Sequence, residues 1–246
     1  MQFTDPHLFA DTSESFRGTV THRSLAAVLD HYLAGDWQAD VVACTGDLIQ
    51  DGSTAAYARF SAQAQRLDLP VHCVPGNHDI REFMQGAMAT PPFFYCDVAE
   101  IGNWLIVGVD SCKSGHAGGA IVASEYDRLG ATIAGSDADH VMVCLHHPPV
   151  VMGSKWLDTV GLDEPDIFFD RVGASGKVRT AIFGHVHQAY DGEHHDIRIL
   201  GTPSTCRQFK PHSDDFAVDE QPPAYRRISL HANGDIETEL IWVADA

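Results

Sequence analysis

Aspartate, asparagine and histidine side chains recur along the chain, each group directly after a short apolar run. The series comprises Asp5, His7, Asp47, Asn77, His78, Asp79, His146, His185 and His187. The apolar runs that lead into the later groups are residues 41–45, 71–75, 141–145 and 180–183. Carboxylate, amide and imidazole donors without a cysteine among them suit manganese, iron, cobalt or zinc. The series therefore predicts a metal site.

The spacing of the donors indicates two ions. Asp5 and His7 offer a carboxylate and an imidazole from one turn, whereas Asp47 stands alone, with both of its oxygens free to bridge two cations. His185 and His187 are one residue apart at the start of a loop, which lets each reach a different ion. Two ions about 3.5–4 Å apart hold a hydroxide between them and bind the oxygens of an in-line displacement.

Each motif also has a plainer interpretation. A lone Asp-x-His or His-x-His is more typical of a surface or a turn than of a metal site. Gly46 and Asp47 alone would pass as a step from a strand into a turn. The occurrence of all five groups in order, each after a predicted strand, favours the metal site.

Strands and helices must alternate to position these groups. Helical spacing predicts helices over 21–33, 53–67, 124–133 and 164–172, between the strands that lead into the donors. The last third is richer in strands, at 197–200, 225–230 and 236–243, and residues 210–223 form a long loop. The donors, at the ends of adjacent buried strands, should converge on one edge of a sheet. We expect one α/β domain over residues 1–246, with two mixed sheets packed together and helices outside.

The composition and net charge exclude some classes of binding partner and cellular location. The 246 residues carry a formal net charge of −18, which argues against nucleic acid or an anionic membrane surface as a partner. Two divalent cations would still leave a positive balance beside only two ligand carboxylates, so a small anion could bind there. The first residues lack the pattern of a signal peptide, and no apolar stretch approaches the length of a membrane span. Six scattered cysteines, three inside apolar runs, suit a reducing compartment, so we expect a cytoplasmic protein.

The ordered motifs D-x-H, G-D, G-N-H-D, a strand-end H and G-H-x-H resemble those of the calcineurin-like metallophosphoesterases. The resemblance implies a four-layer α/β/β/α sandwich. It implies one metal held by Asp5, His7, Asp47 and His187, and a second held by Asp47, Asn77, His146 and His185. His78 would be a catalytic histidine that stabilises phosphoryl oxygens or protonates the leaving oxygen, and Asp79 would orient it. The substrate phosphate would lie beside His7, Asp47, Asn77, His78 and His187.

Further segments are similar to the bacterial class III 3′,5′-cyclic AMP phosphodiesterases. These segments are residues 45–51, 145–149, 155–158 and 202–211. The resemblance implies hydrolysis of cyclic AMP to 5′-AMP by a hydroxide that bridges the metals. A broader phosphodiesterase, such as a glycerophosphodiesterase, and a non-catalytic scaffold are the alternatives. Trp156 or Phe209 would either stack on the base or pack in the interior, and His116 would either line the pocket or lie in a loop. The oligomeric state, a homo-oligomer included, stays open.

Overall fold

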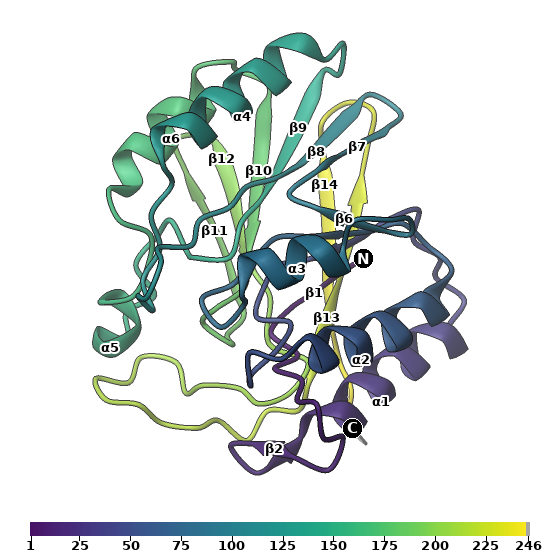
Figure 1. The fold of residues 1–246 in the computed structure, drawn as a ribbon. Helices are drawn as coiled ribbons and strands as arrows, with labels where there is room; N and C mark the ends of the chain where they lie inside the picture. The colour runs from purple at the N-terminus through teal and green to yellow at the C-terminus, as the bar shows by residue number, and fades with distance from the viewer. Residues whose placement is uncertain (245–246) are drawn as a thin grey trace.

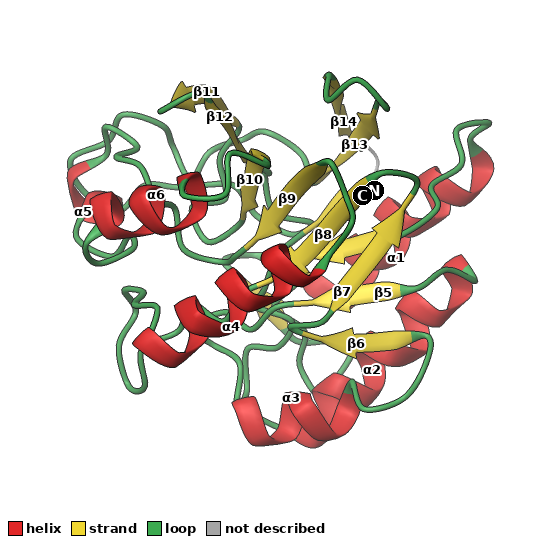
Figure 2. Cartoon of the chain, turned by 90° about the horizontal axis from the view of Figure 1, so that it is seen from above, coloured by secondary structure: helices red, strands yellow, loops and turns green. Residues whose placement is uncertain are grey.

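Two six-stranded sheets form the centre of the computed structural model, which describes residues 1–244 (Figures 1 and 2). The first sheet has the order β14 (Ile236–Trp242), β13 (Ala224–Leu230), β1 (Gln2–Phe3), β4 (Val42–Cys44), β5 (Val71–Cys73) and β6 (Phe93–Tyr95). The second has the order β11 (Tyr190–His194), β12 (Ile197–Gly201), β10 (Val178–Phe183), β9 (His140–Cys144), β8 (Trp104–Gly108) and β7 (Val98–Ile101). Both sheets are mixed, as predicted. The first has antiparallel pairs at its β14 side and parallel pairs from β1 to β6, and the second has parallel strands between antiparallel strands at both edges.

Helices cover the outer face of each sheet (Figure 1). The first sheet is covered by α1 (Thr21–Ala34), α2 (Thr54–Ala64), the short 3-10 helix η1 (Gln65–Leu67) and α3 (Arg81–Ala87). The second is covered by α4 (Ala123–Gly135) and α6 (Pro165–Gly173), and α5 (Lys155–Asp158) lies near the end of that layer. The predicted four-layer sandwich is therefore confirmed.

The buried apolar residues form three clusters, one for each interface between layers. One joins α1 and α2 to the first sheet, and another joins α4 and α6 to the second sheet. The third lies between the sheets and includes Ala43, Met142 and Ile182. Strand runs that are buried on both faces carry no polar alternation, which explains why they are continuously apolar in the sequence.

Differences from the predicted elements concern helix ends and short elements. The helix predicted over 53–67 begins at Thr54, where the Ser53 Oγ accepts a hydrogen bond from the Ala56 N–H, and it ends at Ala64 before η1. Among the short elements that have no counterpart among the predicted ones are β6, β7, β8, β11, α3 and α5. Residues 210–223 are irregular, as expected, apart from one bridge between Phe209 and Val218. No helix within residues 1–244 is long and apolar enough to cross a membrane.

Loops at the ends of β1, β4 and β5 meet loops at the ends of β9 and β10. The donors were expected at one edge of a single sheet, and this was wrong, because both sheets contribute. Two glycines permit the close approach of these loops. A Cβ on Gly76 would lie 2.1 Å from Asp47 Oδ1, and a Cβ on Gly184 would lie 2.1 Å from Thr4 Oγ1. The prediction of one domain over residues 1–246 stays a prediction, and its last two residues lie outside the described part.

Candidate metal centre

Five of the seven predicted ligands have left-handed backbone conformations. They are Asp5, His7, Asp47, His185 and His187, with φ between 46° and 69°. Outside glycine such a conformation costs roughly 1–3 kcal/mol and is concentrated at functional sites. Backbone hydrogen bonds hold the strained turns together, since the Asp5 and His7 N–H groups donate to the Gly46 and Asp47 carbonyls at 3.0 Å.

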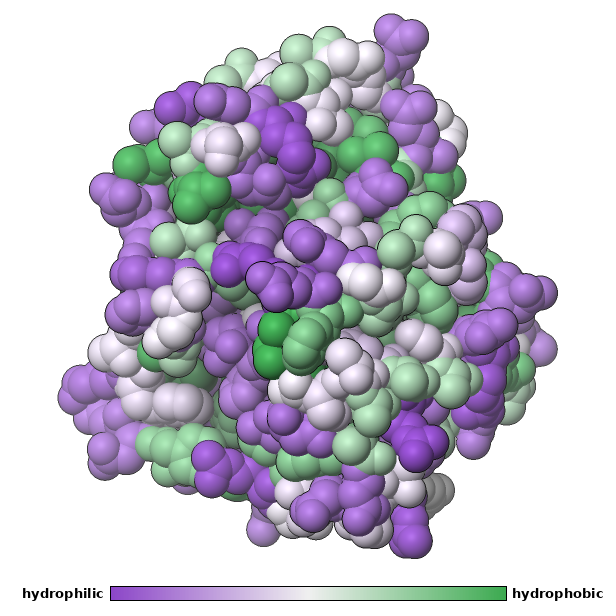
Figure 3. All heavy atoms as spheres, viewed as in Figure 1, coloured by the Kyte–Doolittle hydropathy of each residue, from purple (hydrophilic) through white to green (hydrophobic). Residues whose placement is uncertain are grey.

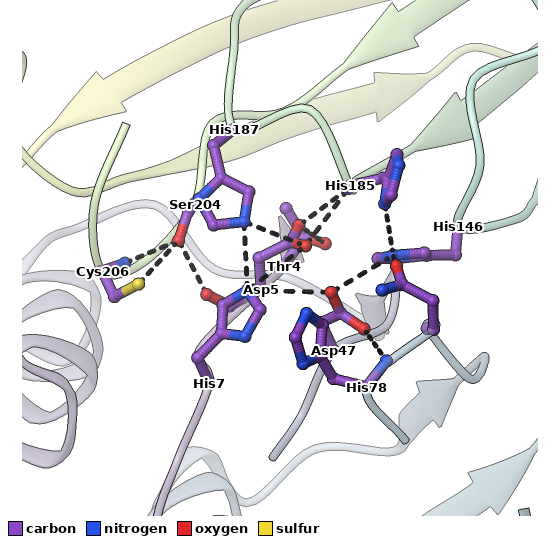
Figure 4. A network of polar contacts seen from close by, with 12 residues as sticks. Thr4, Asp5, His7, Asp47, His78, His146, His185, His187, Ser204 and Cys206 are labelled. Carbon is purple, nitrogen blue, oxygen red and sulfur yellow. Dashed lines mark hydrogen bonds and ion pairs between the residues drawn. The ribbon is translucent and has the colours of Figure 1, made fainter. Parts of the chain in front are cut away.

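The first predicted ligand set is assembled at the end of β1 (Figure 4). His7 Nε2 lies 3.0 Å from His187 Nε2, 3.7 Å from Asp47 Oδ2 and 3.9 Å from Asp5 Oδ1. His187 Nε2 lies 3.4 Å from Asp5 Oδ1. These four donor atoms therefore surround one small volume.

The second predicted set lies beside the first. His146 Nε2 lies 3.5 Å from Asp47 Oδ2, 3.3 Å from Asn77 Oδ1 and 3.2 Å from His185 Nδ1. His185 and His187 therefore face different sets, as their spacing predicted, because both residues have positive φ values that turn the chain between them.

Asp47 joins the two sets through a single oxygen. Its Oδ2 faces both His7 and His146, whereas Oδ1 accepts a hydrogen bond from the His78 N–H at 2.8 Å. The expectation that both oxygens are free to bridge is therefore corrected. Oδ1 anchors the turn that carries Asn77 and His78, and this leaves Oδ2 as the shared donor.

The hydrogen-bond partners of the imidazoles show that the first set fits a cation. His7 Nδ1 contacts Gln50 Oε1 at 2.8 Å, and His187 Nδ1 contacts the Arg207 carbonyl at 2.5 Å. Both partners are acceptors, so both Nδ1 atoms carry the proton and both Nε2 atoms present lone pairs. Two lone pairs facing each other at 3.0 Å beside two carboxylates need a positive charge between them. Carbonyl and amide partners of this kind orient metal-bound histidines.

The second predicted ligand set also fits a cation. His146 Nδ1 donates to the Thr45 carbonyl at 2.7 Å, so its Nε2 lone pair faces Asp47, Asn77 and His185. The buried His185 Nε2 has no hydrogen-bond partner among the described residues. Close groups of potential ligands include His146, His147 and His185 as well as Asp5, Asp47 and His146. The residues therefore fit two cations that share Asp47.

Burial and neighbouring charge set the protonation of these groups. Burial lowers the pKa of His7 and of His185 to about 3, which keeps both imidazoles neutral and able to ligate. Burial alone would lower the pKa of His146 too, but Asp47 and Asp5 raise it to about 9. Histidine contacts hold the pKa of Asp47 well below its usual range despite its burial. Two buried carboxylates thus attract a positive charge, which a metal ion would supply in place of the His146 proton.

His78 and Asp79 lie beside the two sets, where they were predicted. The His78 ring meets the His7 ring edge-on, with centroids 5.0 Å apart. Asp79 accepts hydrogen bonds from the Gly76 and Leu48 N–H groups through Oδ2 and from the Tyr57 hydroxyl through Oδ1. No hydrogen bond joins the carboxylate to the His78 imidazole within residues 1–244. Asp79 therefore supports the turn rather than the ring, and burial together with Asp47 raises its pKa to about 7.

A pocket of about 260 Å³ opens over the first set, and its lining includes all five predicted substrate-binding residues: His7, Asp47, Asn77, His78 and His187. The structure also places Phe209, Trp156 and His116. Phe209 and Trp156 both line the pocket; Phe209 stacks on His187 with centroids 4.1 Å apart and is 8% exposed, whereas Trp156 is half-buried. His116 is exposed and lies outside this lining.

Sequence reasoning missed several residues of the site, among them Phe16, Arg17, Gln50, Tyr57 and Phe216. Phe16 and Arg17 belong to a hairpin. The sequence contains a hairpin pattern at this point, because Arg17 and Gly18 separate two short runs of strand-forming residues. Tyr57 was placed in the core by helical spacing, but its hydroxyl contact with Asp79 carries no local signal. Gln50 likewise contacts His7 only because the loops after β1 and β4 lie side by side.

Known proteins are similar to this chain over most or all of its length. The family model described as calcineurin-like phosphoesterase matches residues 1–189. A 3′,5′-cyclic adenosine monophosphate phosphodiesterase CpdA of Pseudomonas aeruginosa is 36% identical over 245 residues, covering 100% of this chain and 90% of the relative. The protein of the same name from Escherichia coli K12 is 34% identical over 246 residues, with the same coverage.

Solved structures share the fold at low sequence identity. A dimetal phosphatase from Danio rerio superposes with a TM-score of 0.65 at 15% identity and covers 98% of both chains. GAP50, described as the anchor in the inner membrane complex of Plasmodium, superposes with a TM-score of 0.65 at 11% identity over 98% of this chain and 83% of its own. Likenesses at this identity concern the arrangement of strands and helices alone.

Proposed function

Since this chain belongs to the calcineurin-like phosphoesterase family, we propose that it is a dinuclear metal-dependent phosphodiesterase that hydrolyses 3′,5′-cyclic AMP to 5′-AMP. The observation that carries the reaction class is the convergence of carboxylate, amide and imidazole donor atoms from both sheets on two adjacent volumes that share Asp47 Oδ2. Cyclic AMP as the substrate is supported by the relatives named 3′,5′-cyclic adenosine monophosphate phosphodiesterase, which match the whole chain at 34–36% identity.

We propose that Asp5, His7, Asp47 and His187 hold one ion, and that Asp47, Asn77, His146 and His185 hold the other. The mixed oxygen and nitrogen donors favour manganese, iron, cobalt or zinc. Two such ions would activate a water molecule and offset the charge on the phosphate oxygens.

Residues around the proposed metal ligands can assist the hydrolysis of the phosphodiester. The reaction forms a bond from a water oxygen to phosphorus and breaks the P–O3′ bond, and O3′ takes up a proton. The His78 backbone is anchored to Asp47 Oδ1, and its imidazole lines the pocket. From there it can donate to a phosphate oxygen or to the leaving O3′. Asp79 acts as a positioning residue that holds the Gly76–Asp79 turn.

Net charge and the buried cysteines support proposals for the class of substrate and for the cellular compartment. The net charge of −18 favours a small phosphodiester over nucleic acid. Cys44, Cys73 and Cys144 are packed as small core side chains, which supports a reducing cytoplasm.

Turnover measurements test the substrate. The metal-loaded protein should convert cyclic AMP to 5′-AMP faster than it hydrolyses cyclic GMP or a glycerophosphodiester, with products separated by chromatography. Negligible turnover of cyclic AMP by protein with two bound metals would contradict the proposal, and preferred turnover of the glycerophosphodiester would identify the broader enzyme.

Metal analysis tests the centre itself. We expect about two ions per chain by elemental analysis, and Asp47→Ala should reduce both the metal content and the turnover because both sets lose a donor. Asp127→Ala, at an exposed carboxylate on α4, is the matched control and should retain both. A parent protein that binds no metal would instead support a non-catalytic scaffold.

A further inference from the structure

A small hairpin and the long loop meet above the metal centre. The hairpin consists of β2 (Ser15–Phe16) and β3 (Thr19–Val20), joined by Arg17 and Gly18. Both turn residues have positive φ, 51° and 88°, which is the signature of a type I′ turn and matches the twist of the strands. This turn projects the Arg17 side chain over Phe216, whose ring centroid lies 4.6 Å from the guanidinium carbon. The two segments therefore make one wall of the pocket that opens over His7 and His187.

Aromatic rings connect this wall to the metal ligands. Phe16 stacks flat on His7, with centroids 4.4 Å apart and an interplanar angle of 7°. Trp156, Phe209 and Phe216 pack edge-on against one another, with each pair of centroids 5.3 Å apart. Of these rings Phe216 is the most open, at 41% exposure. Figure 3 shows apolar residues in small patches among hydrophilic ones on the face drawn in Figure 1.

Arg17 has no carboxylate partner within the described residues, although the chain carries a net charge of −18. Its guanidinium also lies 5.6 Å from the centroid of Phe16, so it sits between two aromatic rings. A planar guanidinium held in this way presents a flat surface for stacking and N–H groups for ring nitrogens. Bases bind proteins through such stacking on aromatic rings and arginine.

We propose that Arg17, Phe216 and Trp156 form a subsite for the base of a nucleotide whose phosphate lies at the metal centre. This inference rests on the proposed function for the position of the phosphate, and it adds the recognition of the base. The metal ligands recognise only a phosphodiester, so specificity for a nucleotide over a simple diester depends on this second wall. The group is spread over three segments, residues 16–17, 156 and 216, which explains why no single motif reveals it.

Binding of a matched pair of ligands tests the subsite without requiring turnover. The pair is 5′-AMP and ribose 5-phosphate, in which a hydroxyl group replaces the base, and both are titrated into the metal-loaded protein by calorimetry. Phe216→Ala and Arg17→Ala should each weaken 5′-AMP binding by about tenfold or more, and the binding of ribose 5-phosphate should stay within about twofold. Arg17→Lys keeps the charge but loses the flat surface, so it should also weaken 5′-AMP selectively.

Two control variants match these changes. Phe83 on α3 is 40% exposed and lies outside the pocket, so Phe83→Ala removes an equally exposed ring. Arg23 on α1 is exposed, so Arg23→Ala changes the net charge equally. Both controls should bind 5′-AMP as the parent does.

The outcomes separate this inference from the proposed function. Unchanged 5′-AMP binding in Phe216→Ala and Arg17→Ala would overturn the subsite even if cyclic AMP is turned over. Equal losses for both ligands would also overturn it, because the residues would then act on the ribose phosphate that the two ligands share. Selective loss of 5′-AMP binding would support the subsite even in a protein that fails to hydrolyse cyclic AMP.

Discussion

The Tyr57 hydroxyl on α2 donates a hydrogen bond to Asp79 Oδ1 at 2.9 Å and accepts one from the Ile80 N–H at 2.9 Å. Asp79 in turn accepts hydrogen bonds from the Gly76 and Leu48 N–H groups. A helix on the outer face of the first sheet is thus linked to the turn that carries Asn77 and His78. The position of these two site residues depends on a hydroxyl that is remote from the pocket.

Removal of this hydroxyl should therefore destabilise the protein. Tyr57→Phe leaves the Ile80 N–H and one Asp79 oxygen unpaired, so we expect the free energy of unfolding to fall by about 1–3 kcal/mol. Urea denaturation measures this change. Tyr126→Phe is the control, because the Tyr126 hydroxyl makes no hydrogen bond to the described residues. Equal stabilities of the two variants would show that the link to Asp79 is unimportant.

The acceptor beside His7 should control metal affinity. Gln50→Ala removes the oxygen that orients the His7 imidazole, so the affinity for Mn²⁺ should fall roughly 10- to 100-fold. Gln50→Glu keeps an acceptor at this position and should retain most of the affinity. Titration against a competing chelator measures both variants, and an unchanged affinity in Gln50→Ala would rule out this role.

Two glycine substitutions should have opposite effects. Gly76→Ala places a methyl group against the Asp47 side chain and backbone, so metal content and stability should both fall sharply. Gly130 lies in the interior of α4 with no atom near its added Cβ, so Gly130→Ala should stabilise the protein by roughly 0.5–1 kcal/mol. Thermal unfolding and metal analysis compare the two. Normal metal content in Gly76→Ala would contradict the close packing of these loops.

His72 on β5 should make stability depend on pH. Burial lowers its pKa below 6.5 in the folded protein, and its Nδ1 has no hydrogen-bond partner among the described residues. The unfolded chain therefore binds the proton more readily. The stability that this difference contributes is present above pH 6.5 and is lost as the pH falls towards the folded pKa.

Unfolding of His72→Gln at pH 7.5 and 5.5 measures this contribution. The loss of stability between the two values should be smaller in the variant than in the parent, because glutamine does not titrate. An identical loss in both proteins would assign the pH dependence to other groups.

Local patterns in the sequence predicted the parts of the fold that depend on local chemistry. The apolar runs before Asp47 and His146 became strands buried on both faces, and α1 was predicted to within one residue at its end. Short elements such as α3 and β6 were not predicted, because a few residues carry little periodicity of their own. Their positions depend on packing against α2 and β5.

For the site, the sequence by itself determined which donor atoms are available and their order along the chain, because residue types and their positions after strands are local properties. The tertiary structure decided that both sheets contribute, that Asp47 shares only Oδ2, and that Asp79 supports the turn instead of the His78 ring. It also decided that Arg17 meets Phe216 over the pocket. These relationships join residues from 3 to about 200 positions apart, and they depend on how loops from separate strands pack, which no local pattern encodes.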